Sequence, residues 1–131
     1  MTEENGLEQA LISESAINAE VFIKFLNGLR RRLGQAPIAL FMDQLKVHKA
    51  RSVLPIYETL NIRPVFNVGY SPEFNPIEAV FSKVKSQFCR KRLNCLVNKI
   101  GFNADNEIKE ALKSITQEHC ASCTRKGLNL L

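Results

Sequence analysis

The sequence predicts a small α/β fold with parallel strands, because two short apolar runs flank a helical segment. Ile38–Met42 is a continuous apolar run, as expected for a strand that is buried on both faces. Arg63–Val68 is a second apolar run, and Lys49–Leu60 between them carries its apolar residues on one side of a helix. A strand, a helix and a strand within about 30 residues form a βαβ unit, whose strands are parallel neighbours.

Further helices are expected before and after this unit. Asn18 is a good N-cap for a helix with apolar residues at helical spacing, and Gly34 is a good stop. Asn75-Pro76 marks another helix start, because Asn caps a helix and Pro fits its first position. The apolar stripe of that helix is formed by Ile77, Val80, Phe81, Val84 and Phe88.

The two ends of the chain are less regular. Gly6–Ile12 is compatible with a short strand, and a last helix is expected around Ile108–Ile115. No element is assigned to His119–Leu131. We expect an N-terminal segment with a remnant strand, a compact α/β part and a helical tail, at residues 1–17, 18–93 and 94–131.

Charge is distributed unevenly along the chain. The net charge is +5, yet the segment from Met1 to Glu20 contains glutamates and no Lys or Arg, while basic residues cluster at 30–32, 46–51 and 83–92. Such a surface favours a polyanion, and nucleic acid is the first candidate. A solvated basic face without a partner explains the charge equally well. No apolar run approaches the roughly 18–20 residues that span a bilayer.

Two carboxylates are expected at one edge of the predicted sheet. Asp43 ends the buried strand Ile38–Met42, and Glu78 lies in the first turn of the helix that starts at Pro76. Functional groups of open α/β sheets gather at the carboxyl ends of strands, so the two side chains could converge on one cation. A first-turn glutamate favoured by the helix dipole is the simpler interpretation of Glu78.

This segment resembles the mariner-type transposases, a branch of the DDE nucleases with a ribonuclease-H-like fold. In that family a strand ends in an Asp, and a Glu follows at a fixed interval inside a Tyr-Ser-Pro-x-x-Asn-Pro-Ile-Glu signature. The same interval separates Asp43 from Glu78, and Lys85 is similar to the family's helix lysine. The signature is matched at Tyr70, Ser71, Pro72, Asn75, Pro76, Ile77 and Glu78. The resemblance covers roughly residues 7–92 and implies a truncated ribonuclease-H-like fold, with a short, mostly parallel sheet and flanking helices.

The resemblance also implies a site in which three carboxylates hold two divalent ions, and here it is incomplete. No Asp precedes Asp43, and none of the glutamates before it lies in an apolar strand pattern. The segment Met1–Met42 leaves room for one strand and one helix, but not for the family's first two strands or its helix-turn-helix region. Gln44 replaces the usual Asn.

We therefore expect Asp43 and Glu78 to be vestigial ligand positions. Two carboxylates hold paired Mg²⁺ poorly, so the chain alone is not expected to be an enzyme or to need a cofactor. Mg²⁺ is expected only if another chain completes the site.

The missing strands predict a second feature, an open edge along Ile38–Met42. An exposed apolar edge strand is an aggregation hazard, so a stable protein should cover it. The cover could be the N-terminal segment, a second copy or another protein subunit. The residues of this expected partner edge are Ile38, Ala39, Leu40, Phe41 and Met42.

Other residues carry smaller signals. Cys120-x-x-Cys123 beside His119 suggests zinc, but the Cys89 and Cys95 pair has the wrong spacing, and free thiols explain all four cysteines. His48 could touch a phosphate or the metal shell, or face solvent at a helix start. The basic side chains could follow a DNA backbone or only solubilise the surface. The candidate nucleic-acid contacts are Lys46, His48, Lys49, Lys83, Lys85, Arg90, Lys91 and Arg92.

These observations lead to three functional hypotheses. The first is a transposase-derived pseudoenzyme: a nuclear, non-catalytic accessory or scaffold subunit of a larger complex that modifies or rearranges DNA. The alternative is the C-terminal portion of a split or truncated transposase, completed by a chain that supplies the first Asp. The third is a structural subunit without a nucleic-acid role, which salt-independent behaviour would favour.

Overall fold

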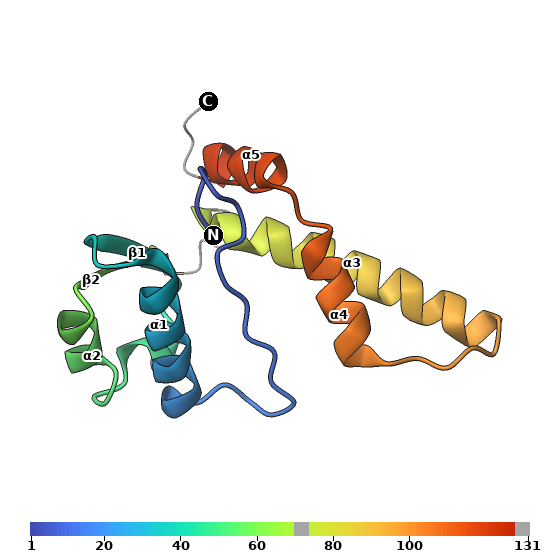
Figure 1. The fold of residues 1–131 in the computed structure, drawn as a ribbon, viewed down its shortest axis with the longest axis horizontal. Helices are drawn as coiled ribbons and strands as arrows, with labels where there is room; N and C mark the ends of the chain where they lie inside the picture. The colour runs from blue at the N-terminus through green and yellow to red at the C-terminus, as the bar shows by residue number, and fades with distance from the viewer. Residues whose placement is uncertain (70–73, 128–131) are drawn as a thin grey trace. The chain divides into compact units, whose positions relative to one another are not determined.

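The computed structural model describes residues 1–69 and 74–127, and the chain divides into two compact units (Figure 1). One unit is Glu8–Asn75, which contains the sheet. The other combines Met1–Leu7 with Pro76–Leu131 and is helical in its described part. The ranges 1–17, 18–93 and 94–131 expected from the sequence stay a prediction. Within the described residues, no helix is both long and apolar enough to cross a membrane.

The first helix of the Glu8–Asn75 unit is α1, Ala19–Leu33, and it has the predicted ends. Asn18 caps it, because its side-chain oxygen accepts a hydrogen bond from the Val21 N–H at 3.0 Å. Gly34 ends it with φ at 73°, a left-handed conformation that glycine adopts without strain.

The sheet of this unit consists of two parallel strands, β1 (Ile38–Met42) and β2 (Ile62–Phe66), as predicted. Their register pairs Ile38 with Ile62 at one end and Met42 with Phe66 at the other. Alternate residues of both strands face the helices and pack on a core whose buried members are Phe22, Leu26, Met42, Val53, Tyr57 and Ile62.

The continuous apolar run of β1 was expected to be buried on both faces, and this expectation is wrong. Ala39 and Val65 are exposed, and they belong to the face that does not contribute to the core. Helices α1 and α2 pack on a single face of the sheet, so only every second residue of each strand is drawn into the core.

The connection between the strands also differs from the single helix predicted at Lys49–Leu60. It contains the 3₁₀ helix η1 (Lys46–Lys49) and a short helix α2 (Leu54–Thr59). Proline lacks an N–H and is tolerated only in the first turn of a helix, so Pro55 places the start of α2 just before itself.

The N-terminal part of this unit contacts α1 and forms no strand. Gln9 donates a side-chain hydrogen bond to the Phe25 carbonyl at 3.1 Å, and the carboxylate of buried Glu8 lies 3.5 Å from Arg32. The short strand considered for Gly6–Ile12 is therefore not present. Before this segment, an isolated antiparallel bridge joins Thr2 and Gly6, which belong to the other unit. Polar side chains at Glu8 and Gln9 bind to the helix instead of supporting a strand ladder.

The helical unit contains α3 (Pro76–Val97), α4 (Ala104–Lys113) and α5 (Gln117–Gly127). Helix α3 begins at Pro76, as predicted, and α4 matches the helix expected around Ile108–Ile115. Helix α5 falls in the segment that the sequence left unassigned. Its Cys120 and Cys123 pack with Val80 and Ile115 in a second, smaller core.

The N-terminal residues of the chain are attached to α5. Arg125 forms an ion pair with Glu3 at 2.8 Å, and Gln117 donates a hydrogen bond to the Glu4 carbonyl. Gly6 has φ at 76°, and a Cβ added to it would lie 2.9 Å from the Gln117 Cα. The close approach of these two backbones therefore requires glycine at position 6.

A buried arginine fixes the starting ends of both strands. The guanidinium of Arg30, near the end of α1, donates to the carbonyls of Gly34, Ala36 and Asn61 at 2.7–2.8 Å. Gly34 and Ala36 precede β1, and Asn61 immediately precedes β2. One planar side chain thus holds α1 and the two strand entries in a fixed arrangement.

We expect Arg30→Met to lower the free energy of unfolding by about 2–4 kcal/mol, because three carbonyls would lose a charged donor. Arg31→Met is the matched control, since Arg31 is exposed on the same helix turn and should change stability by no more than about 0.5 kcal/mol. Urea unfolding of both variants measures the difference. Equal stability of the two variants would contradict this role of Arg30.

Candidate functional site

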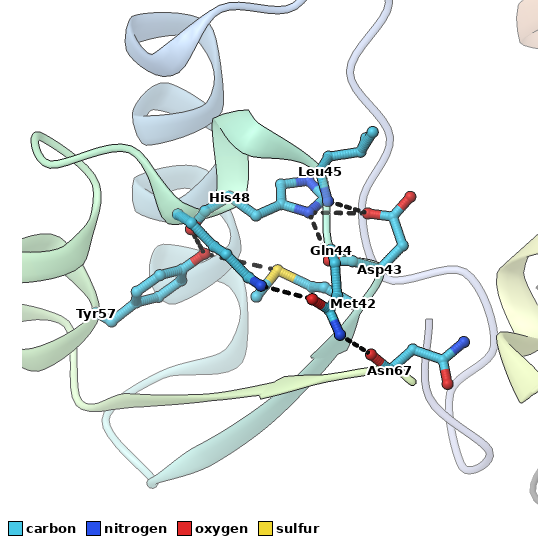
Figure 2. Close-up of polar contacts among 8 residues, drawn as sticks. Met42, Asp43, Gln44, Leu45, His48, Tyr57 and Asn67 are labelled. Carbon is cyan, nitrogen blue, oxygen red and sulfur yellow. Dashed lines mark hydrogen bonds and ion pairs between the residues drawn. The ribbon is translucent and has the colours of Figure 1, made fainter. Parts of the chain in front are cut away.

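The candidate site lies where β1 and β2 end side by side (Figure 2). Asp43 follows the last residue of β1, and Asn67 follows the last residue of β2. The Asn67 N–H donates to the Met42 carbonyl at 2.7 Å, so the parallel pairing continues one step beyond the strands. Asp43 and Asn67 therefore leave the sheet at its carboxyl edge, as the sequence predicted for Asp43.

The Asp43 carboxylate is held on one oxygen. Its Oδ1 lies 3.0 Å from the Nδ1 of His48 and 3.4 Å from the Leu45 N–H. The same His48 nitrogen lies 3.2 Å from the Asp43 carbonyl oxygen. Two acceptors face Nδ1, so this nitrogen carries a hydrogen and donates it. The Asp43 side chain stays 41% exposed.

His48 is not the solvent-facing residue that the sequence suggested as one of its roles. Its side chain is only 16% exposed, and its ring packs on Phe22 with centroids 4.6 Å apart. The packing on α1 orients the imidazole toward Asp43. His48 is thus a positioning residue for the carboxylate, and a contact of His48 with phosphate stays a prediction.

Behind His48, Tyr57 connects η1 to the core. Its hydroxyl donates to the His48 carbonyl at 3.0 Å and lies 3.7 Å from the Met42 sulfur. The ring is almost fully buried, and desolvation raises the pKa of Tyr57 to about 12. The neutral phenol of Tyr57, in α2, therefore holds the η1 segment that carries His48 through one hydrogen bond.

Gln44 joins the two strand ends. Its side-chain amide donates to the Asn67 carbonyl at 2.8 Å, and its oxygen accepts from the Lys49 ammonium at 2.7 Å. Lys49 also lies over the Phe66 ring, 4.9 Å from its centroid. Gln44 stands where the mariner-type transposases usually have Asn, and its longer side chain reaches across to the chain after β2.

Glu78 and most of the predicted basic contacts belong to the other unit. Glu78 lies exposed in the first turn of α3, and Lys85, Arg90, Lys91 and Arg92 are exposed further along that helix. Lys83 is half-buried, and Lys46 is exposed in η1. Tyr70, Ser71 and Pro72 of the signature lie outside the described residues. The roles predicted for Glu78 and for the basic side chains stay predictions.

The described residues do not form a self-contained metal site. Asp43 offers carboxylate oxygen, the ligand that Mg²⁺ prefers, but within 1–69 and 74–127 no group of three or more His, Cys, Asp or Glu is placed to hold an ion. Asp43 alone would supply one ligand, and the remaining ligands would have to come from elsewhere.

The cysteines of the helical unit are free thiols, and three of them are buried. Burial raises the pKa of Cys120, which favours the protonated thiol. Cys123 lies 3.8 Å from the Nε2 of His119, whose pKa is lowered by burial and by the nearby Lys83 and Lys126. Both thiols belong to the second core, where they pack as small apolar side chains.

Comparison with known proteins decides the family. A family model described as DDE superfamily endonuclease matches residues 1–97. The chain belongs to the DDE superfamily of endonucleases. A solved structure, that of the Mos1 transposase catalytic domain with raltegravir and Mg, is similar with a TM-score of 0.62 and 20% sequence identity. The match covers 91% of this chain and 62% of that chain. No curated protein matches the sequence.

These matches confirm the resemblance read from the Tyr70–Glu78 signature and the predicted fold. The chain has the mixed helix and strand fold of a ribonuclease-H-like transposase domain, and it spans about three-fifths of the Mos1 structure. Asp43 directly follows β1, as the sequence predicted.

The supporting roles of Tyr57 and Asn67 are not visible in the sequence. The sequence pattern predicts only an apolar helix residue at Tyr57 and a strand residue at Asn67. The apolar pattern of these segments gives no information on the two roles. Tyr57 and Asn67 act through hydrogen bonds to residues that lie elsewhere in the chain. The spacing of Asp43 and His48 was the one available signal, and a spacing alone does not fix a contact.

Titration of Tyr57 tests this arrangement. Below pH 10 the phenol is neutral in both the folded and the unfolded chain. Above that pH the unfolded chain ionises first, so the free energy of unfolding should fall between pH 10 and the folded pKa of about 12. In a Tyr70→Phe variant, which keeps Tyr57 alone, phenolate absorbance should rise near pH 12. Tyr57→Phe is the control that assigns the transition, and a midpoint near 10 in the Tyr70→Phe variant would show that Tyr57 is not buried.

Proposed function

We propose that this chain is a transposase-derived, non-catalytic subunit of a nuclear complex that acts on DNA. The observation that carries the proposal is the lone carboxylate at the end of β1. Its described partners are His48 and the Leu45 N–H, and among the described residues no group of three or more His, Cys, Asp or Glu is placed to hold a metal ion. Of the other acidic side chains described in the same unit, Glu8 lies against Arg32, Glu20 lies in the first turn of α1, and Glu14 and Glu58 are exposed.

The basic surface supports the DNA part of this proposal. The exposed Lys46 lies in η1, close in sequence to Asp43, and α3 carries Lys85, Arg90, Lys91 and Arg92 on its surface. No Asp or Glu occurs between Glu78 and Asp105, so these cations are not neutralised along their own segment. Side chains of this kind bind phosphate oxygens without reading the base sequence.

The open edge of β1 supports the subunit part. Among the described residues β1 and β2 pair only with each other, and the N-terminal segment contacts α1 without adding a strand. Ile38–Met42 therefore keeps one edge of backbone groups for another chain. We propose that a protein subunit pairs along this edge, which would also remove an aggregation hazard.

Completion of the active site by a second chain is the alternative, and the geometry of Asp43 favours it. His48 and the Leu45 N–H both hold Oδ1, while the carboxylate keeps substantial exposure. A carboxylate fixed in this way suits a ligand position. A partner strand with a suitably placed Asp would support this alternative. A partner with its own unrelated active site, identified by affinity purification and mass spectrometry, would support the accessory role.

Cleavage assays test the non-catalytic role. We expect the purified chain to leave supercoiled plasmid intact in the presence of Mg²⁺, because its carboxylates are too few to offset the dehydration of paired ions. A complete transposase of the same superfamily, assayed in parallel, shows that the conditions support cleavage. Metal-dependent nicking that disappears in Asp43→Ala would overturn the proposal.

Binding of labelled duplex DNA tests the basic surface. Lys85→Glu should weaken binding by about tenfold at low salt and reduce the salt dependence, because a phosphate contact becomes a repulsion. Lys109→Glu is the control, since Lys109 is an equally exposed lysine on α4 of the same unit. Equal losses in both variants would indicate an effect of net charge, and binding that does not change with salt would favour the purely structural hypothesis.

A further inference from the structure

A second apolar face occurs on α3, at its C-terminal end and on the side away from the core. Leu93, Leu96 and Val97 are 61%, 68% and 73% exposed, and Ile100 just after the helix is 64% exposed. Their spacing of three, four and seven positions places them on one side of a helix. We name these four residues the distal stripe.

The distal stripe points away from the rest of its own unit. Leu93 and Val97 each lie two positions from Cys95, which is buried, and two positions on an α-helix are about 200° apart. The inward side of α3 carries Val80 and Val84, which belong to the second core. Helix α3 is therefore apolar on two opposite sides, and only one of them has a partner among the described residues.

Backbone hydrogen bonds define the conformation of the distal stripe up to its last residue. The Ile100 N–H donates to the Cys95 carbonyl at 2.9 Å, and the Lys99 N–H donates to the Leu96 carbonyl at 3.3 Å. Lys99 has φ at 55°, so the helix ends in a Schellman motif that fixes the backbone of Ile100. A preformed surface of this kind loses little conformational entropy when a partner binds.

Basic residues border the distal stripe on both sides. Arg90 and Arg92 lie in the turn before Leu93, on opposite flanks of the stripe, and both are exposed. Lys99 follows at the end of the helix. With no acidic residue between Glu78 and Asp105, the charged borders that α3 itself supplies to the stripe are all positive.

We propose that the distal stripe docks an amphipathic helix of another protein, whose apolar side chains are flanked by Asp or Glu. The charge pattern selects this occupant. A second copy of the chain would bring Arg90 and Arg92 against the same cations, and such like-charge contacts are unfavourable. Phosphate groups of DNA would satisfy the arginines and leave the leucines in water. An acidic amphipathic helix satisfies both, through helix packing at the centre and ion pairs at the rim.

The probe is a designed helical peptide of about three heptads, with leucine at the apolar positions and glutamate beside them. The full chain should bind it in fluorescence anisotropy, more weakly as salt increases. A peptide with lysine in place of every glutamate should bind at least about tenfold more weakly. Similar affinity for the two peptides would overturn the proposal.

Substitutions in the chain locate the site. Leu93→Asn combined with Leu96→Asn should lower the affinity about tenfold or more, whereas Phe81→Asn should leave it unchanged. Phe81 is the matched control because it is exposed on the same helix, about three turns nearer the N-terminus. Arg90→Glu combined with Arg92→Glu should reverse the preference toward the lysine peptide. An equal effect of Phe81→Asn would exclude the distal stripe as the site.

Cys89 provides an independent readout, since it is the exposed cysteine and lies one helical turn before Leu93. Saturating acidic peptide should slow alkylation of Cys89 and, because it binds the folded chain, move urea unfolding to higher urea concentration. Two results would overturn the proposal in favour of another occupant: sedimentation as a dimer that Leu93→Asn dissociates, and binding of anionic vesicles through the stripe.

Discussion

The arrangement of the sheet depends on the contacts of one buried guanidinium. Arg30 holds the last turn of α1, the loop before β1 and the residue before β2 through three carbonyl oxygens. A sheet of two strands has few backbone hydrogen bonds of its own, so its register needs an external constraint. Because Arg30 fixes where both strands start and the strands have equal length, it also determines where they end.

The same constraint also fixes the positions of the carboxyl ends of the two strands. Equal strand lengths place Asp43 beside Asn67, and Gln44 bridges the two chain segments just beyond the sheet. His48 then holds the Asp43 carboxylate, and it can do so because Phe22 and Tyr57 fix it from α1 and α2. The candidate site is thus positioned by the same small core that stabilises the unit.

In the other unit, helix α3 carries apolar side chains on two different sides. Its first half packs inward through Val80 and Val84, while its second half presents apolar side chains outward among arginines. Monomeric proteins seldom expose adjacent large apolar side chains without a function for them. Among the described residues β1 pairs with β2 alone, so its other edge presents backbone groups instead of side chains.

The sequence by itself determined the parallel strands, the helix starts at Asn18 and Pro76, the position of Asp43 at a strand end and the DDE family, because these follow from local periodicity, capping and a contiguous signature. Only the tertiary structure decided that a single face of the sheet joins the core and that His48 turns toward Asp43. Those features depend on contacts between residues far apart in the chain, such as Arg30 with Asn61 and Phe22 with His48. No local pattern encodes such contacts, since they exist only once the helices have packed on the sheet.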